Sequence, residues 1–329
     1  MTERTLVIQT AFLGDVILTT PLLTALAAEF GPVDVVTTPG AAALLESHPA
    51  VRKVVQHDKH RSERGIRGVL RLARRLRAEG YARAYLPHRS WRSGLAAQLA
   101  GIPERIGFDS APAHWTYTRT VHRDPNLHEV PRLLALAGAP DEFAVSLGIS
   151  YADDAAAAAW LDLAGVPKEF VALAPGSIWG TKRWGKFPEL AAELDIFVVT
   201  VGGPEDRALG DTVVAAARSG GINAAGALPL RVSAALLGRA RALVSNDSAP
   251  MHMAQAVGTP VVALFGPTIP AFGFAPRGPD DVVLEVIDLN CRPCSSHGPK
   301  VCPLGHHHCM TRLDVLRVLE ALQPLLTSA

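Results

Sequence analysis

Short β-type apolar runs alternate with helical runs along almost the whole chain, and no other feature limits the fold as strongly. In the first half, the apolar run Thr5–Thr10 leads through a loop into a helical pattern over about Val16–Phe30, and Val33–Thr37 follows as the next β-type run. In the second half the alternation starts again with Phe170–Ala174. Strand–helix alternation of this kind predicts parallel sheets covered by helices. The expected fold class is therefore α/β, with two Rossmann-like units.

The boundary between the two halves is expected near Ser150, where a weak, irregular stretch precedes a new Ala-rich helix. A chain of 329 residues has the length of two domains. The expected domains are residues 1–150 and 151–310, and the second includes a Cys-rich loop over residues 290–310. An amphipathic helix is expected in the final segment, residues 311–329.

Composition and charge exclude several classes of protein. Lys and Arg number 32 against 31 Asp and Glu, so the net charge of +1 rules out a chain-wide polycation that binds nucleic acid. A hydrophobic fraction of 48% excludes wholesale disorder. The chain has no run of 18 or more apolar residues, so we expect no transmembrane segment. The N-terminal apolar stretch lacks a small-residue cleavage site, so the expected location is the cytoplasm.

Two common nucleotide-binding fingerprints are missing from the sequence. Open α/β sheets bind ligands at the carboxyl ends of their strands, so a ligand is expected in a cleft between the two halves. The nearest match to G-x-G-x-x-G, at Gly202-Gly203, has Pro204 and Glu205 where the fingerprint needs glycines, and no G-x-x-x-x-G-K-[ST] occurs. These absences disfavour a dehydrogenase and a P-loop enzyme.

Asp15 follows the first predicted strand and opens a helix, within Leu13-Gly14-Asp15. A carboxylate in this place could act as a general base towards a substrate hydroxyl. Aspartate is also a common helix cap, so a purely capping role is the alternative.

A polar cluster, Ser245–His252, follows a predicted strand and opens a helix. The backbone N–H groups of Ser248 and Ala249, together with the positive end of the helix, would suit a phosphate or pyrophosphate. Asp247 could hold a sugar hydroxyl, and His252, one turn further on, could contact the same anion. The alternative is an ordinary capped helix with a partly buried histidine.

A Gly-rich loop after another predicted strand carries Ser177, Lys182 and Arg183. Two cations in such a loop suit neutralisation of a phosphate, to which Ser177 could also donate. A solvated loop with Trp184 packed on the domain is equally compatible with the pattern.

The stretch Arg61–Arg92 holds ten Arg and two Glu, a local charge of +8. A basic face of this kind suits an anionic partner such as a phosphorylated lipid, a membrane surface or a nucleic acid. Arg89 and Arg92 come just after a predicted strand, so they could face the cleft.

All four cysteines gather near the end of the chain, as Cys291-x2-Cys294-x7-Cys302-x6-Cys309. Their number and spacing would allow a structural Zn²⁺ or an iron–sulfur cluster. The alternative is a compact loop packed with reduced thiols.

Several segments together resemble the ADP-heptose:lipopolysaccharide heptosyltransferases, glycosyltransferase family 9, and look closest to the heptosyltransferase II branch. The resemblance covers nearly the whole chain. The similar segments are Leu13–Val16, Thr20–Leu22, Leu86–Phe108, Ser245–Thr268, Cys291–Cys294 and Cys302–Met310.

The resemblance implies a GT-B fold of two facing Rossmann-like domains, with the C-terminal helix crossing back to the first. It implies an inverting transfer of heptose from ADP-heptose to the lipopolysaccharide inner core, a Kdo/heptose–lipid A acceptor, with no cofactor required for catalysis. The phosphorylated acceptor lies at the inner membrane surface, so the protein would be cytoplasmic and peripheral to the inner leaflet. The N-terminal domain would bind the acceptor and the C-terminal domain the nucleotide sugar.

The resemblance also implies roles for individual residues. Asp15 matches the catalytic base and Lys182 the lysine that neutralises the diphosphate. Ala249 stands where the family usually has a glycine. The implied donor-binding residues are Ser177, Asp247, Ser248, Ala249 and His252, and the implied acceptor-binding residues are Gly14, Arg89 and Arg92.

Two alternatives remain open at the level of the sequence. One is a GT-B glycosyltransferase that uses a different nucleotide sugar. The other is a non-catalytic protein that binds nucleic acid or another anion through the basic face and the Cys cluster. The near-neutral charge and the lack of aromatic residues interleaved with basic ones argue against nucleic acid as a partner.

Overall fold

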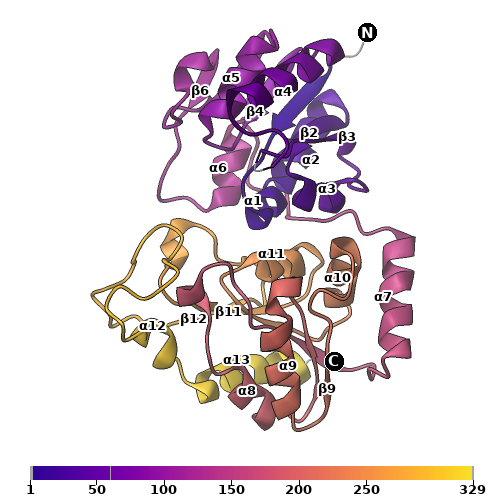
Figure 1. Cartoon of the computed structure of the whole chain (residues 1–329), viewed down its shortest axis with the longest axis vertical. Coiled ribbons are helices and arrows are strands. Elements are labelled where there is room, and N and C mark those ends of the chain that lie inside the picture. Colours follow the sequence, from indigo (N-terminus) through magenta and orange to yellow (C-terminus); the bar gives the residue numbers. More distant parts are fainter. Residues whose placement is uncertain (1–2, 60, 328–329) are drawn as a thin grey trace. The chain divides into compact units, whose positions relative to one another are not determined.

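The computed structural model describes residues 3–59 and 61–327. The chain divides into two compact units, Met1–Gly148 and Ile149–Ala329. In each unit a six-stranded sheet is flanked by helices (Figure 1). The α/β class expected from strand–helix alternation is therefore confirmed.

The first unit is built on a parallel sheet in the order β3-β2-β1-β4-β5-β6. Every residue of its central strand, TLVI, is buried, as expected for a parallel strand covered on both faces. The strands are β1 (Thr5–Ile8), β2 (Val33–Thr37), β3 (Val51–Gln56), β4 (Arg83–Leu86), β5 (Glu104–Phe108) and β6 (Arg119–Val121).

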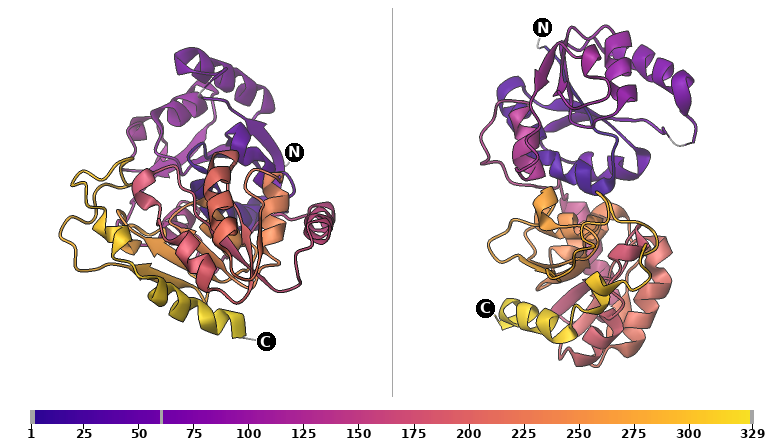
Figure 2. Two further views of the ribbon diagram at one scale, coloured as in Figure 1. Left: turned by 60° about the horizontal axis from the view of Figure 1, so that its bottom comes forward. Right: turned by 90° about the vertical axis from the view of Figure 1, so that its left-hand side faces the viewer.

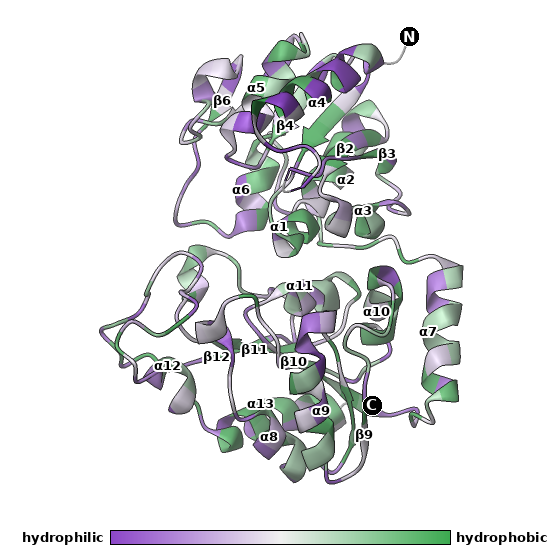
Figure 3. Cartoon of the chain, viewed as in Figure 1, coloured by the Kyte–Doolittle hydropathy of each residue, from purple (hydrophilic) through white to green (hydrophobic). Residues whose placement is uncertain are grey.

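The helices of the first unit bury apolar stripes and leave polar residues outside. In α4, Val69, Leu72 and Leu76 recur at helical spacing and pack into a core with Leu6 of β1. Hydrophilic residues follow the length of α4 (Figure 3), and Gly80, at φ 66°, ends it. The helices are α1 (Leu13–Leu18), α2 (Thr20–Phe30), α3 (Pro39–Leu45), α4 (Gly65–Glu79), α5 (Trp91–Leu99), η1 (His114–Thr116) and α6 (Glu129–Ala135).

The second unit repeats this topology. Its parallel sheet has the order β12-β11-β10-β7-β8-β9, so both sheets show the order 3-2-1-4-5-6 when strands are counted from the start of their own unit. That order is the one found in dinucleotide-binding folds. The strands are β7 (Phe170–Ala174), β8 (Phe197–Thr200), β9 (Gly221–Asn223), β10 (Leu243–Asn246), β11 (Val261–Phe265) and β12 (Val282–Glu285).

The second unit has longer connections than the first. Residues 286–307 form a stretch between β12 and α12 without helix or strand, and this stretch holds three of the four cysteines. The helices are α7 (Tyr151–Leu163), η2 (Gly180–Lys182), α8 (Phe187–Glu193), η3 (Pro204–Asp206), α9 (Arg207–Ala216), α10 (Leu230–Leu237), α11 (Ala249–Ala256), η4 (Pro270–Phe272), α12 (His308–Thr311) and α13 (Val315–Thr327).

The last helix, α13, packs on the second unit. Val318 and Leu322 of α13 are fully buried in the core of that unit, together with Leu264 of β11. Both views of Figure 2 show the yellow C-terminal helix against that unit. The apolar stripe of α13 is thus used within its own unit.

The stretch Leu13–Phe30, which comprises α1 and α2, is long and apolar enough to cross a membrane. The sequence expectation of no transmembrane segment did not anticipate this. However, 56% of the stretch is buried inside the structure, and core helices of soluble proteins meet the same criterion. The length and composition of this stretch are therefore not enough to identify a membrane-spanning helix.

Candidate functional site

The strand order of each sheet marks the place where a ligand is expected. In open parallel sheets, ligands bind outside the carboxyl ends of the strands where the order reverses, here between β1 and β4 and between β7 and β10. Asp15 follows β1, and Arg89 and Arg92 follow β4. Ser177 follows β7, and Asp247 follows β10. Five of the residues expected from the sequence thus lie at these two reversal points, in separate units.

In the second unit, Lys182 and Asp247 form a buried ion pair. Lys182 Nζ lies 2.5 Å from Asp247 Oδ2, with side-chain exposures of 11% and 9%. Thr268 Oγ1 donates to the same carboxylate oxygen at 2.7 Å. Lys182 ends η2, Asp247 begins the turn after β10, and Thr268 lies just past β11. The pair places a desolvated cation at the strand ends, where charge-assisted bonds to a phosphate would be strong.

Asn246, at the end of β10, holds the loops around this pair. It is fully buried, and its Nδ2 donates to the carbonyl oxygens of Pro175 at 2.9 Å and Gly176 at 3.3 Å. Its Oδ1 accepts from the backbone N–H of Trp184 at 3.0 Å. One side chain therefore ties the loop after β7 and the segment after Lys182 to β10. No role was expected for Asn246 from the sequence, although a polar residue at the end of a buried strand is a signal for one.

The remaining predicted donor-site residues lie at the same edge of the second sheet. Ser248 is the N-cap residue of α11, Ala249 is its first residue, and the buried His252 lies one turn further on. Ser177 is also buried, and its Oγ accepts from the backbone N–H of Trp179 at 3.3 Å. The N-terminus of α11 offers unsatisfied N–H groups and positive potential at this edge, which suits an anion.

Gly176 lets the loop after β7 approach the carboxylate of Asp206. A Cβ at position 176 would lie 2.1 Å from Asp206 Cγ and Oδ1. Burial raises the pKa of Asp206, and a bond from the backbone N–H of Gly203 at 3.0 Å opposes that rise. The loops after β7 and β8 therefore meet at this carboxylate.

Replacing Gly176 by alanine is expected to lower the free energy of unfolding by about 1–3 kcal/mol, because the added methyl overpacks the contact with Asp206. Chemical denaturation measures the effect. Gly185→Ala is the matched control, since a Cβ there meets nothing within 4 Å. Equal stability of the two variants would show that the loops can separate without cost.

In the first unit, Asp15 both caps a helix and carries a perturbed carboxyl group. Its Oδ2 accepts from the backbone N–H of Phe12 at 3.2 Å in the first turn of α1. Burial raises the pKa of Asp15 to about 6, and the negative charge of Glu129 adds to the rise. Bonds from the backbone N–H groups of Phe12 and Asp15 and the charge of Arg123 oppose it. A carboxyl group with a pKa near neutrality is suited to accept a proton. Gly14 precedes Asp15 in the same turn.

Glu129, whose charge acts on Asp15, belongs to a buried charge cluster at the start of α6. Its Oε2 pairs with the guanidinium of Arg123 and accepts from Arg132 Nη1 at 3.1 Å. None of these three residues was expected from the sequence to belong to the site. They lie more than 100 positions after Asp15, so no local pattern connects them with it.

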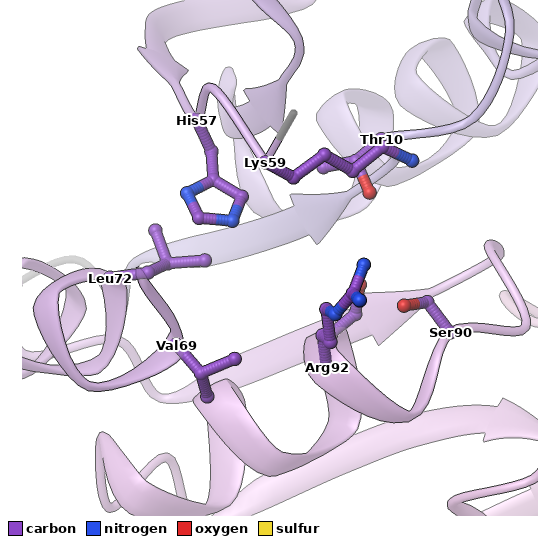
Figure 4. Close-up of a pocket in the computed structure, with 8 residues that line it drawn as sticks. Thr10, His57, Lys59, Val69, Leu72, Ser90 and Arg92 are labelled. Atoms are coloured by element: carbon purple, nitrogen blue, oxygen red, sulfur yellow. The ribbon is translucent and has the colours of Figure 1, made fainter. Parts of the chain in front are cut away.

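The first unit also has a small basic pocket (Figure 4). Burial lowers the pKa of Lys59, and the charge of Arg92 lowers it further, while Asp15 has the opposite effect. An anionic ligand between the two side chains would offset the effect of Arg92 on the charge of Lys59. The pocket is lined by Thr10, His57, Lys59, Val69, Leu72, Ser90, Arg92 and Ser93.

Arg89 and Arg92, expected together from the sequence, lie in different surroundings. Arg92 lines the basic pocket from the first turn of α5, and its guanidinium points into the hollow (Figure 4). Arg89 instead donates from Nη2 to the carbonyl oxygen of Ser110 at 3.1 Å. Lys59 was not singled out by our sequence analysis, although it lies just before the basic stretch.

The four cysteines are free thiols, of which Cys309 is buried. Burial raises the pKa of Cys309 to about 11, and the nearby Cys294 adds to this. Within residues 3–59 and 61–327, no group of three or more His, Cys, Asp or Glu side chains is placed to hold a metal ion. The charges of Cys291, Cys294 and Cys302 act on the Cys309 thiol, so the four thiols lie near one another, and the Zn²⁺ or iron–sulfur cluster considered from the spacing stays a prediction.

Comparison with known proteins points to a single family. The model of glycosyltransferase family 9 (heptosyltransferase) matches residues 69–304. Lipopolysaccharide heptosyltransferase 2 of Escherichia coli (strain K12) is 26% identical over 348 residues, which cover 98% of each chain. A family 9 glycosyl transferase from Veillonella parvula DSM 2008 superposes with a TM-score of 0.89 at 25% identity, covering 100% of this chain and 98% of that one. The E. coli ADP-heptose lps heptosyltransferase II structure gives 0.81 at 25% identity, covering 98% of each chain.

Proposed function

Because the chain belongs to glycosyltransferase family 9, the heptosyltransferases, we propose that it transfers heptose from ADP-heptose to the lipopolysaccharide inner core. The GT-B architecture and the glycosyltransferase activity expected from the sequence are confirmed by these similarities. The observation that carries the proposed donor is the buried Lys182–Asp247 pair at the reversal point of the second sheet.

In the proposed reaction, the second unit holds the donor. Lys182 and the backbone N–H groups of Ser248 and Ala249 stabilise the negative charge that develops on the departing diphosphate. Asp247 accepts a hydrogen bond from a sugar hydroxyl, and Ser177 and His252 complete the phosphate surroundings. These groups are fixed by the fold before the reaction, so they need little reorganisation as charge develops.

The first unit provides the base and the acceptor site. Asp15 removes the proton from the acceptor hydroxyl, whose oxygen attacks the anomeric carbon on the face opposite the diphosphate. The new carbon–oxygen bond forms while the bond to the phosphate oxygen breaks, and ADP leaves with the electron pair. The configuration at the anomeric carbon is therefore inverted. Gly14, Arg89 and Arg92 bind the acceptor, and no cofactor is required for this chemistry.

The acceptor also suggests where the protein works. We assign acceptor binding to residues 1–150, nucleotide-sugar binding to residues 151–310, and a supporting role to the C-terminal helix in 311–329. A lipid-linked, phosphorylated acceptor at the inner membrane surface places the enzyme in the cytoplasm, peripheral to the inner leaflet. The hydrophilic, Arg-rich surface of α4 supports this location, because anionic headgroups attract such a face (Figure 3).

The first test is calorimetric binding of ADP, UDP, GDP and NAD⁺ to the purified chain, without added divalent metal. Selective binding of ADP, followed by turnover of ADP-heptose with a heptose–lipid A acceptor, would support the proposal. A preference for UDP or GDP would replace the donor but keep the reaction class. If no nucleotide bound and DNA bound in a salt-dependent way, the activity would be refuted in favour of anion binding.

The pH dependence of transfer is expected to reflect Asp15. The base must be ionised to accept a proton, so kcat/KM should fall about tenfold per pH unit below its pKa of about 6 and level off above it. Glu129→Gln removes a like charge, and the acid limb should then move to lower pH. A profile that stays flat from about pH 5 to 8 would contradict the assignment.

A further inference from the structure

The Cys-rich segment, defined as residues 291–309, packs against the loop that carries Lys182. The backbone N–H of Thr181 donates to the carbonyl oxygen of Pro299 at 3.4 Å, and the hydroxyl of Thr181 bonds to the same oxygen. A Cβ at Gly180 would lie 2.4 Å from the carbonyl oxygen of Lys300. In Figure 1 this segment is the long orange-to-yellow stretch that leads into α12. The Cys-rich segment therefore covers one side of η2.

His307 makes the most direct connection between the segment and η2. Its Nε2 donates to the carbonyl oxygen of Thr181 at 2.6 Å, since a carbonyl oxygen only accepts. Among the residues that the structure describes, His307 is the one non-glycine residue with positive φ, at φ 52° and ψ 29°. Such a backbone is unfavourable for a residue with a Cβ, and glycine is its usual occupant. The bond to Thr181, which glycine could not make, is a physical reason for histidine at this position.

Arg292 makes a second connection, on the Asp247 side of the ion pair. Its guanidinium, with a side-chain exposure of 4%, donates to the carbonyl oxygen of Thr268 at 2.8 Å and to Glu285 Oε2 at 2.7 Å. It also bonds to the carbonyl oxygen of Gly266. The hydroxyl of Thr268 is the group that donates to Asp247. Arg292 therefore fixes the backbone of the residue that orients this carboxylate.

We propose that the Cys-rich segment positions the Lys182–Asp247 pair for a nucleoside diphosphate, through His307 on one side and Arg292 on the other. The proposal rests on the proposed function for the identity of the ligand. His307 acts through Thr181, the neighbour of Lys182, and Arg292 acts through Thr268. Both are positioning residues, and neither contacts the reacting atoms. The segment thereby gains a role that requires no bound metal.

The role of His307 is tested with a variant that separates an effect on the position of Lys182 from an effect on folding. His307→Gly removes the imidazole and also relieves the unfavourable φ, so the thermal midpoint should stay near that of the wild type. Amide hydrogen exchange across residues 177–184 should rise, and the Kd for ADP should increase about tenfold, as expected for the loss of one positioning bond. The matched control is His308→Ala, whose ring stacks on His306 at 4.1 Å, and it should change neither quantity.

The role of Arg292 is tested with a variant that keeps the positive charge but loses the planar guanidinium. Arg292→Lys retains a cation beside Glu285. An ammonium group, unlike the planar guanidinium, cannot bond at once to Glu285 and to the carbonyl oxygens of Gly266 and Thr268. The Kd of this variant for ADP should therefore rise about tenfold, as for loss of a single bond. Arg317→Lys is the control, because Arg317 donates to the carbonyl oxygen of Glu285 from an exposed position. Full affinity in Arg292→Lys would overturn this role.

Hydrogen exchange keeps the inference independent of the proposed donor. If the wild type did not bind ADP, the proposed function would fail, whereas faster exchange at residues 177–184 alone in His307→Gly would still support positioning. Unchanged local exchange would overturn the inference. Faster exchange throughout the second unit, with a lowered thermal midpoint, would also overturn it, because the segment would then act on folding alone.

Discussion

Replacing Asp15 by asparagine is expected to lower kcat by about 10²–10⁴-fold, the usual contribution of a general base. The amide cannot take the proton of the acceptor hydroxyl. Its oxygen can still accept from the backbone N–H of Phe12, so the first turn of α1 and the fold should be preserved. Steady-state transfer assays measure kcat, and calorimetry should show an unchanged affinity for ADP, since Asp15 belongs to the other unit.

The control for this variant is Glu104→Gln, which removes a partly exposed carboxylate at the start of β5, the opposite end of the strand from the ligand edge. It should leave kcat unchanged. If Asp15→Asn retained turnover, the base assignment would be wrong, and the raised pKa of Asp15 would reflect only its burial and the charge of Glu129. If Asp15→Asn lost ADP affinity instead, Asp15 would act in donor binding.

The buried strands of the fold were predictable because a parallel strand covered on both faces is a continuous apolar run. Val33–Thr37 and Phe170–Ala174 were expected and observed with the same bounds. The strands that the sequence did not reveal are short or mixed in polarity, and three of them lie towards the edges of a sheet. These strands are β5, β6, β9 and β12. In β5, β6 and β9, charged, polar or glycine residues interrupt runs of three to five residues, so little apolar pattern is left to recognise.

The site was predictable only in part, for a related reason. Asp15 and Asp247 each follow an apolar strand, so the rule that ligands bind at strand ends singled them out. The pairing of Lys182 with Asp247 joins positions 65 residues apart, and only the fold brings them together. The same holds for the effect of Glu129 on Asp15. The contact of His307 with Thr181 likewise joins distant positions and has no local sequence signal.

Replacing Lys182 by methionine is expected to weaken ADP binding by about 10- to 100-fold, the value of one charge-assisted bond. The reason goes beyond the lost cation. Asp247 would remain buried at the strand ends with the Thr268 hydroxyl as its bonded partner, and its negative charge would oppose an incoming phosphate. Calorimetry measures the affinity. Lys186→Met, further along the same loop, is the control and should bind ADP normally.

The same variant is expected to lose stability, and a double variant separates the two effects. Breaking a buried ion pair by removing one partner costs about 3–5 kcal/mol, because the other charge stays buried and unpaired. Lys182→Met combined with Asp247→Asn removes both charges and should regain most of the lost free energy of unfolding, measured by denaturation. It should not regain ADP affinity, since the cation is still missing. Recovery of ADP affinity in the double variant would mean that Lys182 serves only to neutralise Asp247, and the proposed diphosphate contact would be wrong.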